Sequence, residues 1–255
     1  MDTIPLRAIH TCAAACFGRL GREGVVWLRR VRPLGVQLPG VAALLVLLLP
    51  LNSHAVELYD SFPETIHANE RYVVYSHGLI VEGKDPRPIS PKYGQYDFPG
   101  IKEALFEGGD FNLIAYQRPK SPDDAYVGTL KSWVRQLLDA GVKPSHITLV
   151  GFSRGAQLTA FASADLAPVG INTALLAICE DGDLHRDPAL VLGGNLLSIY
   201  ETSDQLGSCV KLAARSHLSS FKEVPITTGR SHGAFFQALP EWLQPLKSWI
   251  AETNR

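Results

Sequence analysis

The stretch Gly151-Phe152-Ser153-Arg154-Gly155 is the clearest indication of the fold in this sequence. It follows an apolar run at residues 146–150 and precedes a helix-like run at residues 156–161. We therefore predict a strand, a sharp turn and a helix, with Ser153 at the apex of the turn. Glycine at both ends of the stretch removes Cβ atoms that would clash where the strand doubles back into the helix. Such a context is typical of a nucleophile elbow, whose serine hydroxyl stands free beside the positive end of a helix.

The sequence around this stretch alternates between apolar strand-like runs and helix-like runs. The predicted strands are residues 72–76, 111–116, 146–150, 173–178, 195–200 and, more weakly, 221–227. The predicted helices include residues 98–106, 121–141, 156–161 and 235–251. Continuous apolar strands that alternate with helices indicate a parallel sheet covered on both faces. We expect an α/β fold, a three-layer α/β/α sandwich with a mostly parallel sheet.

Length and composition set the limits of this fold. The chain has 255 residues, of which 46% are hydrophobic and 19% are charged, and this suits one substantial core. The formal net charge of -1 offers no electrostatic basis for binding nucleic acid.

The N-terminal segment has the pattern of a targeting sequence. Residues 1–33 are rich in arginine, residues 41–49 are apolar, and Ser53 and Ala55 are small residues of the kind that a signal peptidase recognises. We expect residues 1–55 to be an export signal or an N-terminal membrane anchor, and residues 56–255 to form the α/β domain. The apolar run is shorter than the roughly 20 residues of a membrane span, which favours a cleaved signal and an exported protein, periplasmic or secreted. Any membrane contact would then be made by this segment alone.

Side chains with catalytic chemistry follow three of the predicted strands. Ser153 follows residues 146–150, Asp204 follows residues 195–200, and His232 comes after the last strand. In a parallel sheet these positions meet at one edge. A serine hydroxyl becomes a good nucleophile when an imidazole takes its proton, and the imidazole needs a carboxylate to fix its tautomer. We predict these three residues as nucleophile, acid and base.

The identity of the acid is left open by the sequence. Glu201 lies nearer the strand than Asp204, and Asp181 and Asp183 follow the preceding strand. Asp204 is preferred, although it also suits an N-cap for a helix at residues 205–215.

An oxyanion needs donors that are already in place where the charge develops. The backbone N–H of Arg154 and that of Leu79 or Gly78 are the expected donors. His77 is expected to be a structural histidine.

These features together resemble the α/β-hydrolase superfamily: the run at residues 72–78, the elbow, Asp204 after a strand and His232 before a helix. The resemblance covers nearly all of the chain after Val56, and it implies Ser153, Asp204 and His232 as a catalytic triad with Leu79 and Arg154 as oxyanion donors. It also implies a sheet of about eight strands, or a trimmed version of it. Two features depart from the pattern. Arg154 is charged, and the antiparallel pair expected first would be missing or would lie within residues 56–70.

The rest of the chain predicts the surroundings of the site. The segment between Ile178 and Asn195 is too short for a large cap domain, so the loop at residues 82–97, with Tyr93 and Tyr96, would shape the pocket. Arg154 would either attract an anionic substrate group or bridge nearby carboxylates.

Cys179 and Cys209 follow neighbouring strands and would form a disulfide in an exported protein, or else two buried thiols. No histidine pair has recognised metal-ligand spacing, so we expect no metal and no cofactor.

The predicted function is a serine hydrolase that acts on a small-molecule carboxylic ester through an acyl-enzyme. The same triad would also suit an amidase or peptidase. A non-catalytic exported binding protein on a hydrolase scaffold is the alternative from another class.

Overall fold

The structure is a computed structural model that describes residues 55–180, 184, 187 and 189–253. The segment predicted as an export signal or membrane anchor, residues 1–55, lies outside the described residues except for Ala55. In the part of the chain that the structure describes, no helix is both long and apolar enough to cross a membrane.

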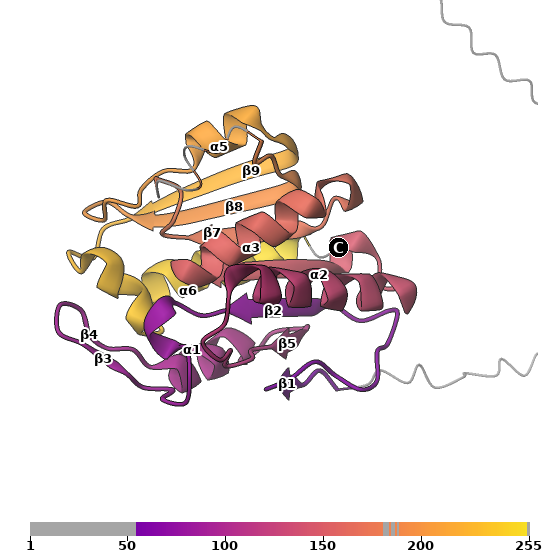
Figure 1. The fold of residues 1–255 in the computed structure, drawn as a ribbon, viewed down its shortest axis with the longest axis horizontal. Coiled ribbons are helices and arrows are strands. Elements are labelled where there is room, and N and C mark those ends of the chain that lie inside the picture. The colour runs from indigo at the N-terminus through magenta and orange to yellow at the C-terminus, as the bar shows by residue number, and fades with distance from the viewer. Residues whose placement is uncertain (1–54, 181–183, 185–186, 188, 254–255) are drawn as a thin grey trace, which may run out of the picture. The chain divides into compact units, whose positions relative to one another are not determined.

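Within the residues that the structure describes, seven parallel strands form the main sheet, in the order β1-β5-β2-β6-β7-β8-β9 (Figure 1). Their bounds are β1 Leu58–Tyr59, β2 Tyr72–Ser76, β5 Asn112–Ile114, β6 Ile147–Phe152, β7 Asn172–Leu176, β8 Gly193–Glu201 and β9 His217–Ile226. The central strands β2, β6 and β7 are buried along their whole length, as their continuous apolar sequences predict. The edge strand β9 is mostly exposed or half-buried, which explains its weak apolar pattern.

The N-terminal edge of the sheet differs from the arrangement that the resemblance implied. The two-residue strand β1 lies within residues 56–70, where the antiparallel pair was sought, but it runs parallel to β5. Among the described residues, the main sheet has no antiparallel strand. A small antiparallel hairpin, β3 Ile89–Ser90 with β4 Gly94–Gln95, stands apart from it.

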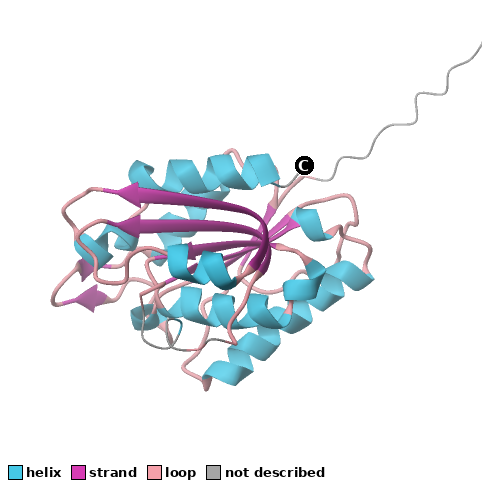
Figure 2. Cartoon of the chain, turned by 90° about the horizontal axis from the view of Figure 1, so that it is seen from above, coloured by secondary structure: helices cyan, strands magenta, loops and turns pink. Residues whose placement is uncertain are grey.

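Helices cover both faces of the sheet, as Figure 2 shows from above. Their bounds are α1 Phe98–Phe106, α2 Asp123–Asp139, α3 Arg154–Asp165, α5 Val210–Arg215 and α6 Pro240–Thr253. On one face, α2 and α3 pack with Val74 and Ile114 of the sheet. On the other face, α1 and α6 share a core in which Trp242 and Trp249 are buried. The expected three-layer α/β/α sandwich is therefore confirmed.

In the described part of the chain, four short 3₁₀ helices connect these elements: η1 Leu79–Val81, η2 Pro144–His146, η3 Ala167–Val169 and η4 Ser231–Phe236. The helix predicted at residues 235–251 is in fact divided. Residues up to Phe236 belong to η4, and α6 begins only at Pro240, a residue suited to the first turn of a helix.

Candidate active site

The elbow forms as the sequence predicts, with β6 ending at Phe152 and α3 beginning at Arg154. Between them Ser153 has φ 52° and ψ -121°, a backbone conformation that residues other than glycine rarely adopt. A Cβ atom at Gly155 would lie 2.0 Å from the carbonyl oxygen of Ser76, and one at Gly151 would lie 2.5 Å from that of Gly155. Glycine is therefore required on both sides of the serine, because the backbone of the turn packs directly against neighbouring backbone.

Three side chains from three separate loops form a hydrogen-bonded chain at this edge of the sheet. His232 Nε2 lies 2.8 Å from Ser153 Oγ, and His232 Nδ1 lies 2.6 Å from Asp204 Oδ2. The imidazole and the carboxylate are mostly buried, with side-chain exposed fractions of 13% and 6%. When Nδ1–H donates to the carboxylate, Nε2 is left as an acceptor for the serine hydroxyl. This arrangement is able to remove the hydroxyl proton as the serine attacks a carbonyl carbon.

Of the rival carboxylates, Glu201 alone is among the described residues, and it does not take the place of Asp204. Asp181 and Asp183 lie outside them. Glu201 is fully buried and accepts hydrogen bonds from the backbone N–H groups of Thr228 and Gly229 and from Ser203. Burial acts to raise the pKa of Glu201, but these hydrogen bonds outweigh it and lower the pKa below its ordinary value. Glu201 thus lies next to the site as an ionised group that does not contact the histidine.

The predicted oxyanion donors open two helices. Leu79 is the first residue of η1 and Arg154 the first of α3, and the N–H groups of a first helical turn have no acceptor within their helix. Leu79 lines the same pocket as Ser153 and His232. The role of both N–H groups as oxyanion donors stays a prediction.

The guanidinium of Arg154 contacts side chains of α2 and α3. Its Nη2 forms an ion pair with Asp123 of α2, and its Nη1 donates to Gln157 Oε1 at 2.6 Å. Of the two interpretations that the sequence left open, these contacts fit the structural one, although Arg154 joins one carboxylate and one amide and not two carboxylates.

His77 is buried and makes two hydrogen bonds with its ring. Its Nδ1 donates to Gly78 O at 2.8 Å, and its Nε2 accepts from the backbone N–H of Arg118 at 3.0 Å. Burial and the neighbouring Arg118 charge lower the pKa of His77 to about 3. The ring is therefore neutral and holds the loop after β2 in place.

Sequence reasoning missed Arg118, which organises this loop. Its guanidinium donates to His77 O at 2.5 Å and to Glu82 Oε1 at 2.9 and 3.0 Å. Its backbone carbonyl accepts from Gly83 N–H at 3.1 Å. The only signal in the sequence was its place just after a predicted strand, at the edge of the sheet where the loops gather.

An apolar pocket of about 210 Å³ opens beside Ser153. Leu79, Ile80 and Phe236 line it together with Ser90, Tyr93 and Tyr96 of the loop at residues 82–97. The Tyr93 ring lies 5.8 Å from the His232 ring between centroids, and the Tyr96 hydroxyl is 3.0 Å from that of Tyr75. The loop expected to shape a pocket thus forms one wall of this one.

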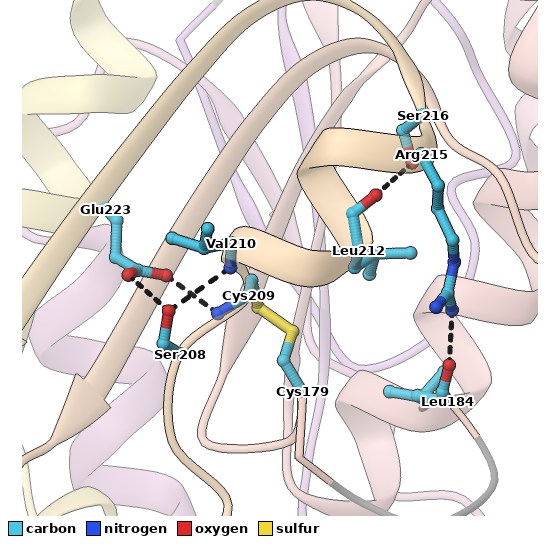
Figure 3. Close-up of a disulfide and its surroundings, with 9 residues drawn as sticks. All are labelled: Cys179, Leu184, Ser208, Cys209, Val210, Leu212, Arg215, Ser216 and Glu223. Carbon is cyan, nitrogen blue, oxygen red and sulfur yellow. Dashed lines mark hydrogen bonds between the residues drawn. A yellow bond between two sulfur atoms is a disulfide. The ribbon is translucent and has the colours of Figure 1, made fainter. Parts of the chain in front are cut away.

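A disulfide joins Cys179, just after β7, to Cys209, the residue before α5 (Figure 3). Their Cα atoms are 4.9 Å apart. The Cys209 N–H donates to Glu223 Oε1 at 2.7 Å, and the Ser208 hydroxyl donates to Glu223 Oε2 at 2.7 Å. The residues directly before α5 are therefore joined covalently to the loop after β7 and by hydrogen bonds to β9.

Within the described ranges, no group of three or more acidic, histidine or cysteine side chains is placed to hold a metal ion.

No family model matches the sequence, and no curated protein matches it. Solved structures do match over most of the chain. The HSL homologue EstE7 from a metagenome library is 15% identical with a TM-score of 0.51, and the match covers 75% of this chain and 81% of that chain. An esterase from the bacterial hormone-sensitive lipase family is 16% identical, also with a TM-score of 0.51, over 74% of this chain and 78% of the other.

Identities this low carry information about the fold alone. These neighbours share the α/β-hydrolase fold, as the parallel sheet, the flanking helices and the elbow at Ser153 also indicate. The chain therefore has the fold of the α/β-hydrolase superfamily, which its motifs resemble.

Proposed function

We propose that this protein is a serine hydrolase that cleaves a small carboxylic ester through an acyl-enzyme on Ser153. The observation that carries the proposal is the hydrogen-bonded chain of Ser153, His232 and Asp204, with contacts of 2.8 and 2.6 Å. The elbow supports it as well, because the serine stands in a strained turn beside a pocket.

In the proposed reaction, Ser153 Oγ attacks the ester carbonyl carbon while His232 Nε2 takes the hydroxyl proton. The Asp204 carboxylate stabilises the imidazolium that forms. Backbone N–H groups of Leu79 and Arg154 would stabilise the negative oxygen of the tetrahedral intermediate. The imidazolium then gives its proton to the departing alcohol, and a water molecule, deprotonated by His232, releases the acid and frees the serine.

The pocket supports a small, apolar substrate group. Its volume of about 210 Å³ is below the roughly 300 to 1,000 Å³ of sites that hold drug-sized ligands. Its walls are mainly aromatic and aliphatic side chains. An ester is favoured over an amide because the two solved structures described above are a hormone-sensitive lipase homologue and an esterase.

The experiment is a panel of p-nitrophenyl esters of increasing acyl length, with p-nitroanilides beside them. We expect Ser153-dependent hydrolysis that is fastest for short acyl chains. Ser153→Ala and His232→Gln should each lower kcat by about 10⁴-fold or more. The control Ser219→Ala changes an exposed serine on β9 and should leave kcat unchanged.

A fluorophosphonate probe gives an independent check. It should label the wild type and the Ser219→Ala control but not Ser153→Ala. A folded wild-type protein that hydrolyses no ester and takes no label would rule the enzyme out and favour a binding role. Cleavage of anilides but not esters would favour an amidase.

We also propose that the protein is exported. The pattern of residues 1–55 supports this, as does the Cys179–Cys209 disulfide, since disulfides persist in oxidising compartments. N-terminal sequencing of the full chain after expression in a bacterium should find a mature start near Val56. An uncleaved chain in the membrane fraction would instead identify the segment as an anchor.

A further inference from the structure

Glu201 is a buried carboxylate beside the site that the proposed reaction does not use. It ends β8 and its exposed fraction is 0%. Its Oε1 accepts the N–H groups of Thr228 at 2.9 Å and Gly229 at 3.0 Å. Its Oε2 accepts the N–H of Ser203 at 2.7 Å and also the Ser203 hydroxyl. Among the described residues, no lysine, arginine or histidine forms an ion pair with it.

The donors to Glu201 come from the two loops that carry Asp204 and His232. Ser203 directly precedes Asp204, and Thr228 and Gly229 begin the loop that leads to His232. The same glutamate also accepts the Asp204 N–H at 2.9 Å through its backbone carbonyl. One residue therefore contacts both loops, and each oxygen of its carboxylate serves a different loop.

The loop that carries His232 includes two residues in the left-handed region. Gly229 has φ 70°, and Ser231, directly before His232, has φ 50°. A non-glycine residue holds such a conformation only where its surroundings enforce it. The Ser231 hydroxyl donates to Ser203 O at 3.3 Å, and Glu201 holds the other end of the loop. The position of the imidazole thus depends on contacts to the segment at residues 201–204.

We propose that Glu201 is a positioning residue, whose carboxylate sets the Asp204 loop and the His232 loop at the separation at which His232 reaches both Asp204 and Ser153. Its effect on catalysis rests on the proposed function, whereas its effect on the Asp204–His232 hydrogen bond does not. An ionised carboxylate suits the task because it accepts at both oxygens and donates at neither.

The test compares two isosteric changes. In Glu201→Gln an amide NH₂ replaces one oxygen and faces N–H donors, so one of the two loops loses its acceptor. The matched control is Glu223→Gln. Glu223 also accepts one N–H and one hydroxyl at 2.7 Å, but from Cys209 and Ser208, at the α5 end of the connection between β8 and α5, and it accepts nothing from the loop that carries His232.

We expect Glu201→Gln to lower kcat for a short p-nitrophenyl ester by about 10²-fold, because a displacement of about 1 Å has such an effect. KM should change less than about threefold, since the apolar pocket walls are untouched. Glu223→Gln should change both constants by less than about threefold. Wild-type kcat in a folded Glu201→Gln variant would overturn the proposal.

Proton NMR provides a readout that needs no substrate. The Nδ1 proton of His232, shared with Asp204, should give a low-field resonance that disappears in Asp204→Asn. We expect it to be lost or shifted in Glu201→Gln and unchanged in Glu223→Gln. An unchanged resonance in Glu201→Gln would overturn the proposal. A wild-type protein that shows the resonance but hydrolyses nothing would refute the proposed function and leave this test in force.

A second variant covers the case in which Glu201→Gln does not fold. Ser203→Ala removes only the hydroxyl donor and leaves every backbone N–H in place. We expect a shifted His232 resonance and a fall in kcat of about threefold to tenfold, smaller than for Glu201→Gln because the Ser203 N–H still donates to Glu201 Oε2. A resonance and a kcat equal to those of the wild type would overturn the proposal.

Discussion

The two sides of the candidate site are held in place by opposite charges. The loop at residues 77–83, which we call the oxyanion side, is arranged around the guanidinium of Arg118. The segments at residues 201–204 and 228–232, the acid–histidine side, are arranged around the carboxylate of Glu201. Arg118 is paired with an anion, Glu82, whereas the partners of Glu201 are backbone N–H groups and one hydroxyl.

This difference shows two ways of burying a charge. A buried ion pair depends on both partners, because removal of one leaves the other charged and desolvated. A carboxylate that accepts several N–H groups is stabilised by dipoles that the fold already provides, and it binds separate segments together. We therefore expect removal of one ion of the Arg118–Glu82 pair to destabilise the oxyanion side. The acid–histidine side should be disturbed by changes that separate its two segments.

The largest effect is expected from Arg118→Met. Arg118 and Glu82 have side-chain exposed fractions of 1% and 11%, so the variant leaves a nearly buried carboxylate unpaired. We expect a loss of about 3 to 5 kcal/mol in the free energy of unfolding, measured in urea. Adding Glu82→Gln to this variant should restore part of the lost free energy of unfolding, because the unpaired charge is then removed.

The control is Lys131→Met, which breaks an ion pair with Asp165 whose side chains are 25% and 54% exposed. Lys131→Met should lower the free energy of unfolding by less than about 1 kcal/mol. Equal losses in the two variants would show that burial is not what makes the Arg118 pair matter.

The disulfide is the next strongest test, on the acid–histidine side. It spans a sequence separation of 30 residues, and the double variant Cys179→Ala/Cys209→Ala should lose about 3 to 4 kcal/mol of stability. Hydrogen exchange should become faster at residues 201–209 and stay unchanged at residues 77–83. Faster exchange on both sides would show that the two sides are not independent.

The sheet, the elbow and the order of the three site residues were predictable because each has a local signature. Continuous apolar runs identified β2, β6 and β7, and Gly151 and Gly155 identified the elbow. The strand β1 has only two residues, too few for any periodicity, and its parallel pairing with β5 depends on the folded sheet.

The choice between Glu201 and Asp204 could not be made from the sequence with the same certainty. The two carboxylates are three positions apart, and a turn in which Asp204 N–H donates to Glu201 O sends them in different directions. Arg118 was missed for a related reason, since its place just after a predicted strand does not show that its side chain is buried. The roles of Glu201 and Arg118 can be recognised only when their hydrogen-bond partners are known from the structure.

Mild acid should weaken the oxyanion side before the acid–histidine side. His77 has a folded-state pKa of about 3 against an ordinary value of 6.5, so the unfolded chain binds the extra proton. Its stabilising contribution is complete above pH 6.5 and is lost as the pH falls toward 3, by about 1.4 kcal/mol for each unit, or about 2 kcal/mol between pH 7 and pH 5. Glu201, whose pKa is lowered from 4.5, loses its contribution only at lower pH.

The measurement is the free energy of unfolding in urea from pH 8 to pH 5, in the wild type and in His77→Gln. His146, whose pKa is also lowered, adds to the slope of both proteins, so the difference between them reports His77. A wild-type slope that His77→Gln does not reduce would contradict the assignment of a neutral, buried His77.

The smallest effect is expected where the two loops of the acid–histidine side meet at the surface. The Thr202 and Thr227 hydroxyls lie 3.0 Å apart across the same pair of segments that Glu201 joins, but this contact is exposed. Water replaces such a bond readily, so Thr202→Val should change the free energy of unfolding by about 0.5 kcal/mol or less and leave the His232 NMR resonance in place. Thr202 N–H still donates to Ile226 O at 2.9 Å in this variant, which keeps the strands in register. A loss of ester hydrolysis in Thr202→Val comparable with that expected for Glu201→Gln would mean that any contact between the loops suffices, and that the buried carboxylate has no special part in holding them.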